Sequence, residues 1–139
     1  SCEYSLTFEI EPPPSARPGK PFGIPVIVAV RPVSNQTTNP AQQFVAHASL
    51  RNENHSPATM QLTGTLTSSV CSRNGNTVPG YARFNSLCIG QSGRYRIRVM
   101  LGAASYVGVT TKEYVDSAVI HVHPSADGVQ RLRMFRILW

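Results

Sequence analysis

Apolar and polar residues alternate along much of this chain with a period of two, which is typical of half-buried β-strands. The alternation is strictest in residues 94–99, where an apolar set and an arginine row share one strand. The apolar set is Tyr95, Ile97 and Val99, and the arginine row is Arg94, Arg96 and Arg98. Neighbouring side chains of a strand point to opposite faces. The sequence therefore predicts that the apolar set is buried and that the arginine row is largely exposed.

The same pattern predicts the other strands of the chain. Residues 81–89 are rich in aromatic and aliphatic side chains, and we expect them to form a hairpin with the arginine-bearing strand through a tight turn at residues 91–93. Gly64 interrupts a strand predicted at residues 60–70, which indicates a bulge or a close backbone approach. The small residues 102–108 are expected to form a flexible connection. Further strands are predicted at residues 4–10, 24–30, 44–50 and 114–123.

Short strands separated by turn residues, with almost no helical pattern, predict an antiparallel β-sandwich. The 139 residues are most simply one domain, since this length is enough to bury a substantial core. With 41% hydrophobic and 14% charged residues, the composition is that of a folded protein rather than of a disordered one. We therefore expect a single all-β domain over residues 1–139.

The C-terminal residues 125–139 have two interpretations that stay open. Ser125 or Asp127 is a suitable N-cap for a short helix, and this interpretation is favoured. Read with a period of two, the same residues form a strand instead. An exposed apolar end is unfavourable in either case, so we expect it to pack on the sandwich or to line a dimer interface. This apolar end comprises Phe135, Ile137, Leu138 and Trp139.

The charge of the chain is strongly positive. Thirteen basic residues against seven acidic ones give a net charge of +6 and a pI near 9.7. All the basic residues except Lys20 and Lys112 are arginines, whose planar guanidinium group suits bidentate contacts with phosphate or carboxylate. This composition indicates an anionic partner without naming it. The arginine row is accordingly either a solvated sheet face or a functional basic face, and the sequence leaves both interpretations open.

The sequence lacks motifs for catalysis or cofactor binding. It contains no nucleophile elbow, no phosphate-binding loop, no dinucleotide-binding fingerprint and no paired carboxylates. His121 and His123 have a spacing that suits a metal on one face of a strand, but only His47 and His55 are available to join them. Solvent-facing histidines are therefore the favoured interpretation. We expect a non-enzyme with no cofactor, no metal and no small-molecule substrate.

Cysteines and glycosylation patterns bear on the compartment. The three cysteines lack metal-ligand spacing, which favours reduced thiols in an intracellular protein, although a Cys71–Cys88 pair stays open. Asn35 and Asn54 begin acceptor patterns for N-glycosylation, which would suit a secreted protein. The sequence has no apolar run long enough to cross a membrane, so we expect no membrane partner.

Three stretches of the chain resemble the fungal velvet domain in order and spacing. They are Leu62-Thr63-Gly64, then Gly80-Tyr81-Ala82-Arg83-Phe84-Asn85-Ser86-Leu87-Cys88-Ile89, then Gly93-Arg94-Tyr95-Arg96-Ile97-Arg98. The family carries a Leu-Thr-Gly stretch, a Gly-Tyr-Phe-x-Phe-x-Asp-Leu-type strand and a Gly-x-Tyr-Arg-Leu-Arg-type strand in this order. Residues 4–7 and 14–17 are similar to its first strand and to the Ala-Arg motif that follows. The chain resembles a divergent member, because Asn85 or Ser86 stands where the family tends to have Asp.

The resemblance implies an immunoglobulin-like sandwich akin to the Rel-homology DNA-binding domain. It also implies a regulator of fungal development and secondary metabolism in the nucleus and cytoplasm, acting as a homodimer or as a heterodimer with another velvet protein. In the family, basic residues of the loop after the first strand contact DNA. This role carries over to Arg17 and Lys20, with Arg31 as a further candidate. So few phosphate contacts imply a modest and strongly salt-dependent affinity.

Two other functions stay open. One is a partner-binding sandwich without DNA binding, in which the arginine row serves only solvation. The other is an extracellular immunoglobulin-like adhesion module, which the glycosylation patterns and a Cys71–Cys88 pair would suit.

Overall fold

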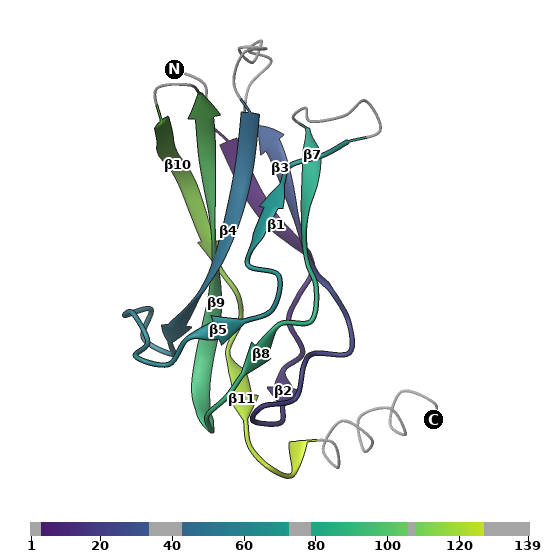
Figure 1. Ribbon diagram of the computed structural model, residues 1–139, viewed down its shortest axis with the longest axis vertical. Helices are drawn as coiled ribbons and strands as arrows, with labels where there is room; N and C mark the ends of the chain where they lie inside the picture. Colours follow the sequence, from purple (N-terminus) through teal and green to yellow (C-terminus); the bar gives the residue numbers. More distant parts are fainter. Residues whose placement is uncertain (1–3, 34–42, 73–78, 106–107, 127–139) are drawn as a thin grey trace.

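A computed structural model describes residues 4–33, 43–72, 79–105 and 108–126 of the chain. These residues contain eleven β-strands and no helix, and they form a sandwich (Figure 1). The strands are β1 (Tyr4–Ile10), β2 (Ser15–Ala16), β3 (Val26–Pro32), β4 (Gln43–Asn52), β5 (Leu62–Thr63), β6 (Thr67–Ser69), β7 (Gly80–Phe84), β8 (Cys88–Ile89), β9 (Gly93–Ser105), β10 (Gly108–Asp116) and β11 (Ile120–Val122). The predicted all-β fold is confirmed.

The strands form two main layers. The first is a three-stranded antiparallel sheet in the order β1-β3-β7. The second has the order β2-β11-β9-β4-β6, with β10 beside β9, and its β2–β11 pair is parallel. The chain repeatedly changes layer, since β1, β3 and β7 of the first layer are separated in sequence by strands of the second. The short β5-β8 pair joins the lower half of the sandwich in Figure 1.

The core lies between the two layers and is filled by their inward-facing side chains. Tyr95, Ile97 and Val99 are buried, as the alternation predicted. The facing side chains of the other strands are Val26, Val28 and Val30 from β3, Ala82 and Phe84 from β7, and Phe44, Ala46, Ala48 and Leu50 from β4. Burying each larger apolar side chain contributes about 1.5–3 kcal/mol, so this shared core holds the layers together.

The hairpin predicted between residues 81–89 and the arginine-bearing strand is wrong. β7 ends at Phe84 in the first layer, whereas β9 begins at Gly93 in the second, so the chain crosses between the layers here. Between them, Ser86 has a positive φ of 54° and β8 pairs with β5 rather than with β9. Leu87 is fully buried next to this bend. Its burial requires the chain to turn inward, which an alternating pattern alone does not reveal.

The close backbone approach predicted at Gly64 is confirmed. Gly64 lies between β5 and β6 and has a φ of 115°. A Cβ atom at this position would lie 2.4 Å from the carbonyl oxygen of Ser86. The next N–H group, that of Thr65, donates to the carbonyl oxygen of Asn85 at 3.0 Å. Glycine therefore lets this segment pack against the bend that follows β7.

A tyrosine fixes the start of β9. Tyr95 is buried, and its hydroxyl donates to the carbonyl oxygen of Ser92 at 3.3 Å. A Cβ atom on Gly93 would lie 2.9 Å from this hydroxyl oxygen, so glycine leaves the room that the ring needs. Immunoglobulin-like sandwiches carry the same arrangement, the tyrosine corner, at the start of strand F. Two residues later, where antibody domains have a disulfide cysteine, this chain has the fully buried Ile97.

β9 is longer than predicted, because residues 102–105 continue the strand and do not form a flexible connection. On the side away from β4, β9 pairs with β11 at its start and with β10 over the rest of its length. The strand predicted at residues 114–123 is therefore divided into β10 and β11. At the division, the Ser117 N–H donates to the carbonyl oxygen of Ile97, and the Ile97 N–H donates to Ser117 Oγ, both at 2.9 Å. The buried serine side chain thus replaces the missing strand partner.

Candidate functional site

Two of the three predicted DNA contacts lie on one loop. Arg17 and Lys20 belong to residues 17–25 between β2 and β3, which we call the β2 loop, and both are exposed. Nε of Arg17 donates to the carbonyl oxygen of Pro124 at 3.1 Å. Because β2 pairs in parallel with β11, this contact ties the loop to the residues that follow β11. The loop lies at the end of the sandwich that carries β8 and β11 (Figure 1).

The backbone of the β2 loop is held against the bend between β7 and β9. The N–H of Gly19 donates to the carbonyl oxygen of Ile89 at 2.8 Å, and the N–H of Phe22 donates to that of Leu87 at 2.7 Å. The Phe22 side chain is buried in the core. A loop fixed at two points and anchored by an aromatic ring loses little further conformational entropy when it contacts a partner.

Two histidines lie beside the β2 loop. His121 on β11 is exposed and His123 is half-buried, with their ring centroids 4.5 Å apart. Nδ1 of His123 is 2.9 Å from Oγ of Ser125. His47 on β4 and His55 in the turn after β4 bond to other groups and do not join this pair. Within the described ranges, no group of three His, Cys, Asp or Glu side chains is placed to hold a metal ion.

Arg31, the third predicted DNA contact, lies apart from the β2 loop. It is near the far end of β3, opposite Ser5 of β1. At about 3.4 Å per residue, Arg31 is about 17 Å further along the strand than Val26, where β3 leaves the loop. Its guanidinium group is also 3.7 Å from a carboxylate oxygen of Glu9. The structure therefore brings together Arg17 and Lys20 but not Arg31.

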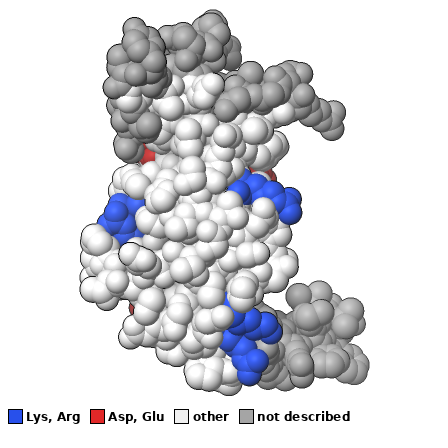
Figure 2. Space-filling model, viewed as in Figure 1, with Lys and Arg blue, Asp and Glu red and all other residues white. Residues whose placement is uncertain are grey.

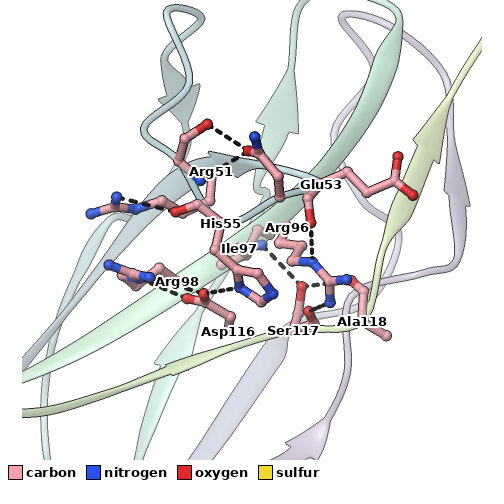
Figure 3. Close-up of polar contacts among 11 residues, drawn as sticks. Arg51, Glu53, His55, Arg96, Ile97, Arg98, Asp116, Ser117 and Ala118 are labelled. Carbon is pink, nitrogen blue, oxygen red and sulfur yellow. Dashed lines mark hydrogen bonds and ion pairs between the residues drawn. The ribbon is translucent and has the colours of Figure 1, made fainter.

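The arginine row on β9 faces the turn that follows β4 (Figure 3). Arg94 donates to both carboxylate oxygens of Glu53, at 2.9 and 3.3 Å. This hydrogen bond holds the pKa of Glu53 below its ordinary value, although both side chains are about half exposed. Arg96 donates to two backbone carbonyl oxygens, those of Glu53 at 2.8 Å and Ser117 at 3.0 Å. These two arginines thus join the turn after β4 to the link between β10 and β11.

The third arginine of the row is largely buried in an ion pair. Arg98 donates to Asp116 through Nε at 2.7 Å and Nη2 at 3.0 Å, and it stacks on the Tyr114 ring with its central carbon 3.9 Å from the centroid. Nδ1 of His55 donates to the same carboxylate at 2.5 Å. Burial opposes ionisation of Asp116, but the hydrogen bonds from Arg98 and His55 outweigh it and hold the pKa of Asp116 below its ordinary value.

The prediction that the arginine row is largely exposed is wrong for Arg98, whose side chain is 13% exposed, and Arg96 is half-buried. The three guanidinium groups do point away from the core, as the alternation requires. Residues far along the chain then cover them, chiefly Glu53 and Asp116. The row therefore forms a network of hydrogen bonds and ion pairs that holds loops to a sheet, and its exposure falls from Arg94 to Arg98. Nothing in the period of a strand indicates which distant carboxylates will fold over it.

Lysine and arginine side chains gather in separate places on the face drawn in Figure 2, with uncharged surface between them. This face carries no continuous basic stripe within the part of the chain that is described. Within the described residues, this face therefore has no long basic surface, and an anionic partner would contact separate groups of cations there.

The remaining predicted features are placed as follows. Cys71 and Cys88 carry free thiols, so they do not form the disulfide that the sequence left open. Asn54 is exposed in the turn after β4, whereas Asn35 lies outside the described residues. The apolar end with Phe135, Ile137, Leu138 and Trp139, together with the predicted helix, also lies outside them. No helix of the described ranges is long and apolar enough to span a membrane.

Comparison with protein-family models and with curated proteins finds no match for this chain. The fold and the placement of its side chains are therefore the basis for any function. Sequence reasoning missed Glu53, His55 and Ser117, each of which holds part of the arginine row. His55 adopts a positive φ of 72°, which is uncommon for a residue other than glycine.

Proposed function

We propose that this chain is a velvet-like regulatory domain that binds DNA through the phosphate backbone, with Arg17 and Lys20 of the β2 loop as its contacts. The observation that carries the proposal is a contrast between the two groups of cations. The β2 loop presents exposed cations from a backbone that is hydrogen-bonded at Gly19 and Phe22. In the arginine row, by contrast, Arg96 is half-buried and the Arg98 side chain is only 13% exposed.

Phosphate contacts of this kind set affinity and position but carry little sequence information. Arg17 has a planar group suited to bidentate phosphate binding, and Lys20 adds a point charge three residues later. We leave Arg31 out of the proposed contacts, because it lies at the far end of β3 next to Glu9. The proposal extends to the biology that the velvet resemblance implies, namely regulation of development and secondary metabolism in the nucleus and cytoplasm, together with another velvet subunit or a second copy.

The test is a titration of a short DNA duplex at two salt concentrations. We expect the double variant Arg17→Ala/Lys20→Ala to bind all duplexes more weakly and to lower the slope of log affinity against log salt by up to about 2 units. Arg51→Ala/Arg94→Ala removes the same charge from strands β4 and β9, outside the β2 loop, and serves as the control. Equal weakening by both double variants would show a general charge effect and would contradict a site on the β2 loop.

A partner-binding sandwich without DNA contacts is the second candidate. The observation that favours it is the presence of exposed large apolar side chains within the described ranges: Ile24, Val33, Tyr81 and Tyr114. If wild-type protein binds no duplex at low salt, alone or with a velvet partner, the result would favour this second function over DNA binding.

A further inference from the structure

Two histidines lie on the outer face of the sheet at β11. Ile120 and Val122 are fully buried, so His121 between them points outward, and His123 continues the same face. Their ring centroids are 4.5 Å apart. The contact between Nδ1 of His123 and Oγ of Ser125 uses one nitrogen of that ring and leaves Nε2 for a further contact. The pair therefore presents two imidazole groups side by side to a partner on this face.

Strand pairing places Arg17 directly beside this pair. β11 pairs in parallel with β2, which lies next to it in Figure 1, and Val122 is opposite Ala16. In the same register, His123 is level with Arg17 on the neighbouring strand, about 4.8 Å away. Ala16 is buried, so Arg17 and His123 share the outer face. Nε of Arg17 donates to the carbonyl oxygen of Pro124 at 3.1 Å, which holds the arginine side chain against the end of β11.

The charged groups around the pair come from the two elements on either side of it. On the β2 side they are Arg17 and then Lys20, whose N–H donates to the carbonyl oxygen of Arg17 at 3.3 Å. On the β9 side Arg94 is opposite His121, and its charge is paired with Glu53. The cations without a carboxylate opposite them in this register are thus on the β2 side. An anion bound by the β2 loop therefore lies next to the two imidazoles.

We propose that His121 and His123 extend the phosphate-binding surface of the β2 loop and bind phosphate in their protonated form. This inference rests on the proposed function and adds its regulation by pH. Only the protonated ring carries a positive charge and donates from both nitrogens. A phosphate group beside Arg17 supplies the opposite charge that favours this form. Binding therefore takes up protons, and by linkage the affinity for DNA rises as the pH falls.

The pH range of the effect follows from the residue type. Among side chains with ordinary pKa values, only histidine changes its charge between about pH 5 and pH 8. The added affinity should therefore be absent near about pH 8 and fully present near about pH 5. Carboxyl groups stay largely ionised over this range, because their ordinary pKa values are about 4.

The first test is a fluorescence anisotropy titration of a short duplex at about pH 7.5 and about pH 5.5, at one ionic strength. Wild-type affinity should rise roughly 10-fold at the lower pH, since a tenfold change corresponds to a coupling of about one pKa unit. His121→Gln/His123→Gln should lose most of this rise. His47→Gln removes an exposed histidine of β4 and should keep it. Thermal melting at both pH values checks that each variant is folded.

The second test measures the protons directly. Calorimetric titration with the same duplex near pH 6.5, in two buffers of different ionisation enthalpy, gives the number of protons taken up on binding. Wild-type protein and His47→Gln should take up protons, up to about two per site, because two imidazoles are present. His121→Gln/His123→Gln should take up far fewer.

The outcomes separate this inference from the function on which it rests. Wild-type protein that binds no duplex at either pH would overturn both. Binding of equal strength at the two pH values, without proton uptake, would overturn the inference and leave phosphate binding by Arg17 and Lys20 in place. A rise in affinity that His121→Gln/His123→Gln retains in full would overturn the inference as well, because other groups would then carry the effect.

Discussion

The pairing of Arg98 with Asp116 gives the sharpest stability prediction, tested by Asp116→Asn. The substitution keeps the shape of the side chain but removes the charge. Breaking one side of a buried ion pair costs about 3–5 kcal/mol, because the other charge is left buried and uncompensated. Here Arg98 remains 13% exposed and stacked on Tyr114, and an asparagine oxygen still accepts one hydrogen bond. We therefore expect a smaller loss, about 2 kcal/mol of the free energy of unfolding.

Urea denaturation at pH 7 measures this loss, and Glu53→Gln is the matched control. Glu53 pairs with Arg94 in a similar bidentate manner, but both side chains are about half exposed. Exposed pairs contribute little because water and salt screen the charges, so the control should lose much less stability than Asp116→Asn. A loss of stability for Asp116→Asn that is no larger than the loss for Glu53→Gln would refute the conclusion that Arg98 is buried by its pairing with Asp116.

The same comparison has a defined dependence on pH. The pKa of Asp116 is held below its ordinary value in the folded protein. A carboxyl group with a lowered pKa stabilises the fold fully above its unfolded pKa of about 3.9, and this stabilisation is lost as the pH falls through the folded value. The difference in the free energy of unfolding between wild type and Asp116→Asn should thus be full at pH 7 and should shrink as the pH falls below about 4. A gap of constant size down to pH 2 would contradict the charged pair.

Two further substitutions test the core and the bend by denaturant unfolding. Ile97→Ala removes a fully buried side chain and should cost about 2–5 kcal/mol, whereas a loss under about 1 kcal/mol would mean that the faces of β9 are reversed. Gly64→Ala places a Cβ atom against the Ser86 carbonyl oxygen at a φ of 115° and should cost about 1–3 kcal/mol. Gly23→Ala, where a Cβ atom meets nothing within 4 Å, is its control and should change stability far less.

The sequence predicts the class of fold and the buried face of β9 because both follow from local alternation. Tyr95, Ile97 and Val99 are buried for the reason that the pattern gives. Gly64 is also predictable, since glycine in a strand marks a place where another backbone comes close. The division of residues 81–89 into two strands is not predictable in this way. At this bend Leu87 is fully buried and Ser86 lies against the distant Gly64, and neither contact follows from local alternation.

The candidate site was predictable only in part, for a similar physical reason. Charge and loop placement identify Arg17 and Lys20, which the fold does keep together. How far the arginine row is exposed depends on Glu53 and Asp116, which lie far from it in sequence. Glu53 contacts the row from the turn after β4, and Asp116 contacts it from β10. Ion pairs between such distant residues are a property of the tertiary fold.

We propose that the β2 loop, and not the arginine row, contacts an anionic partner. The most direct measurement is a two-dimensional amide NMR titration of the protein with a short DNA duplex at low salt. We predict that the largest shifts fall on the amides around Arg17 and Lys20 and on the neighbouring His121 and His123, and that they reverse when salt is added. Shifts centred on the amides of Arg94, Arg96 and Arg98, with the β2 loop unaffected, would contradict the claim.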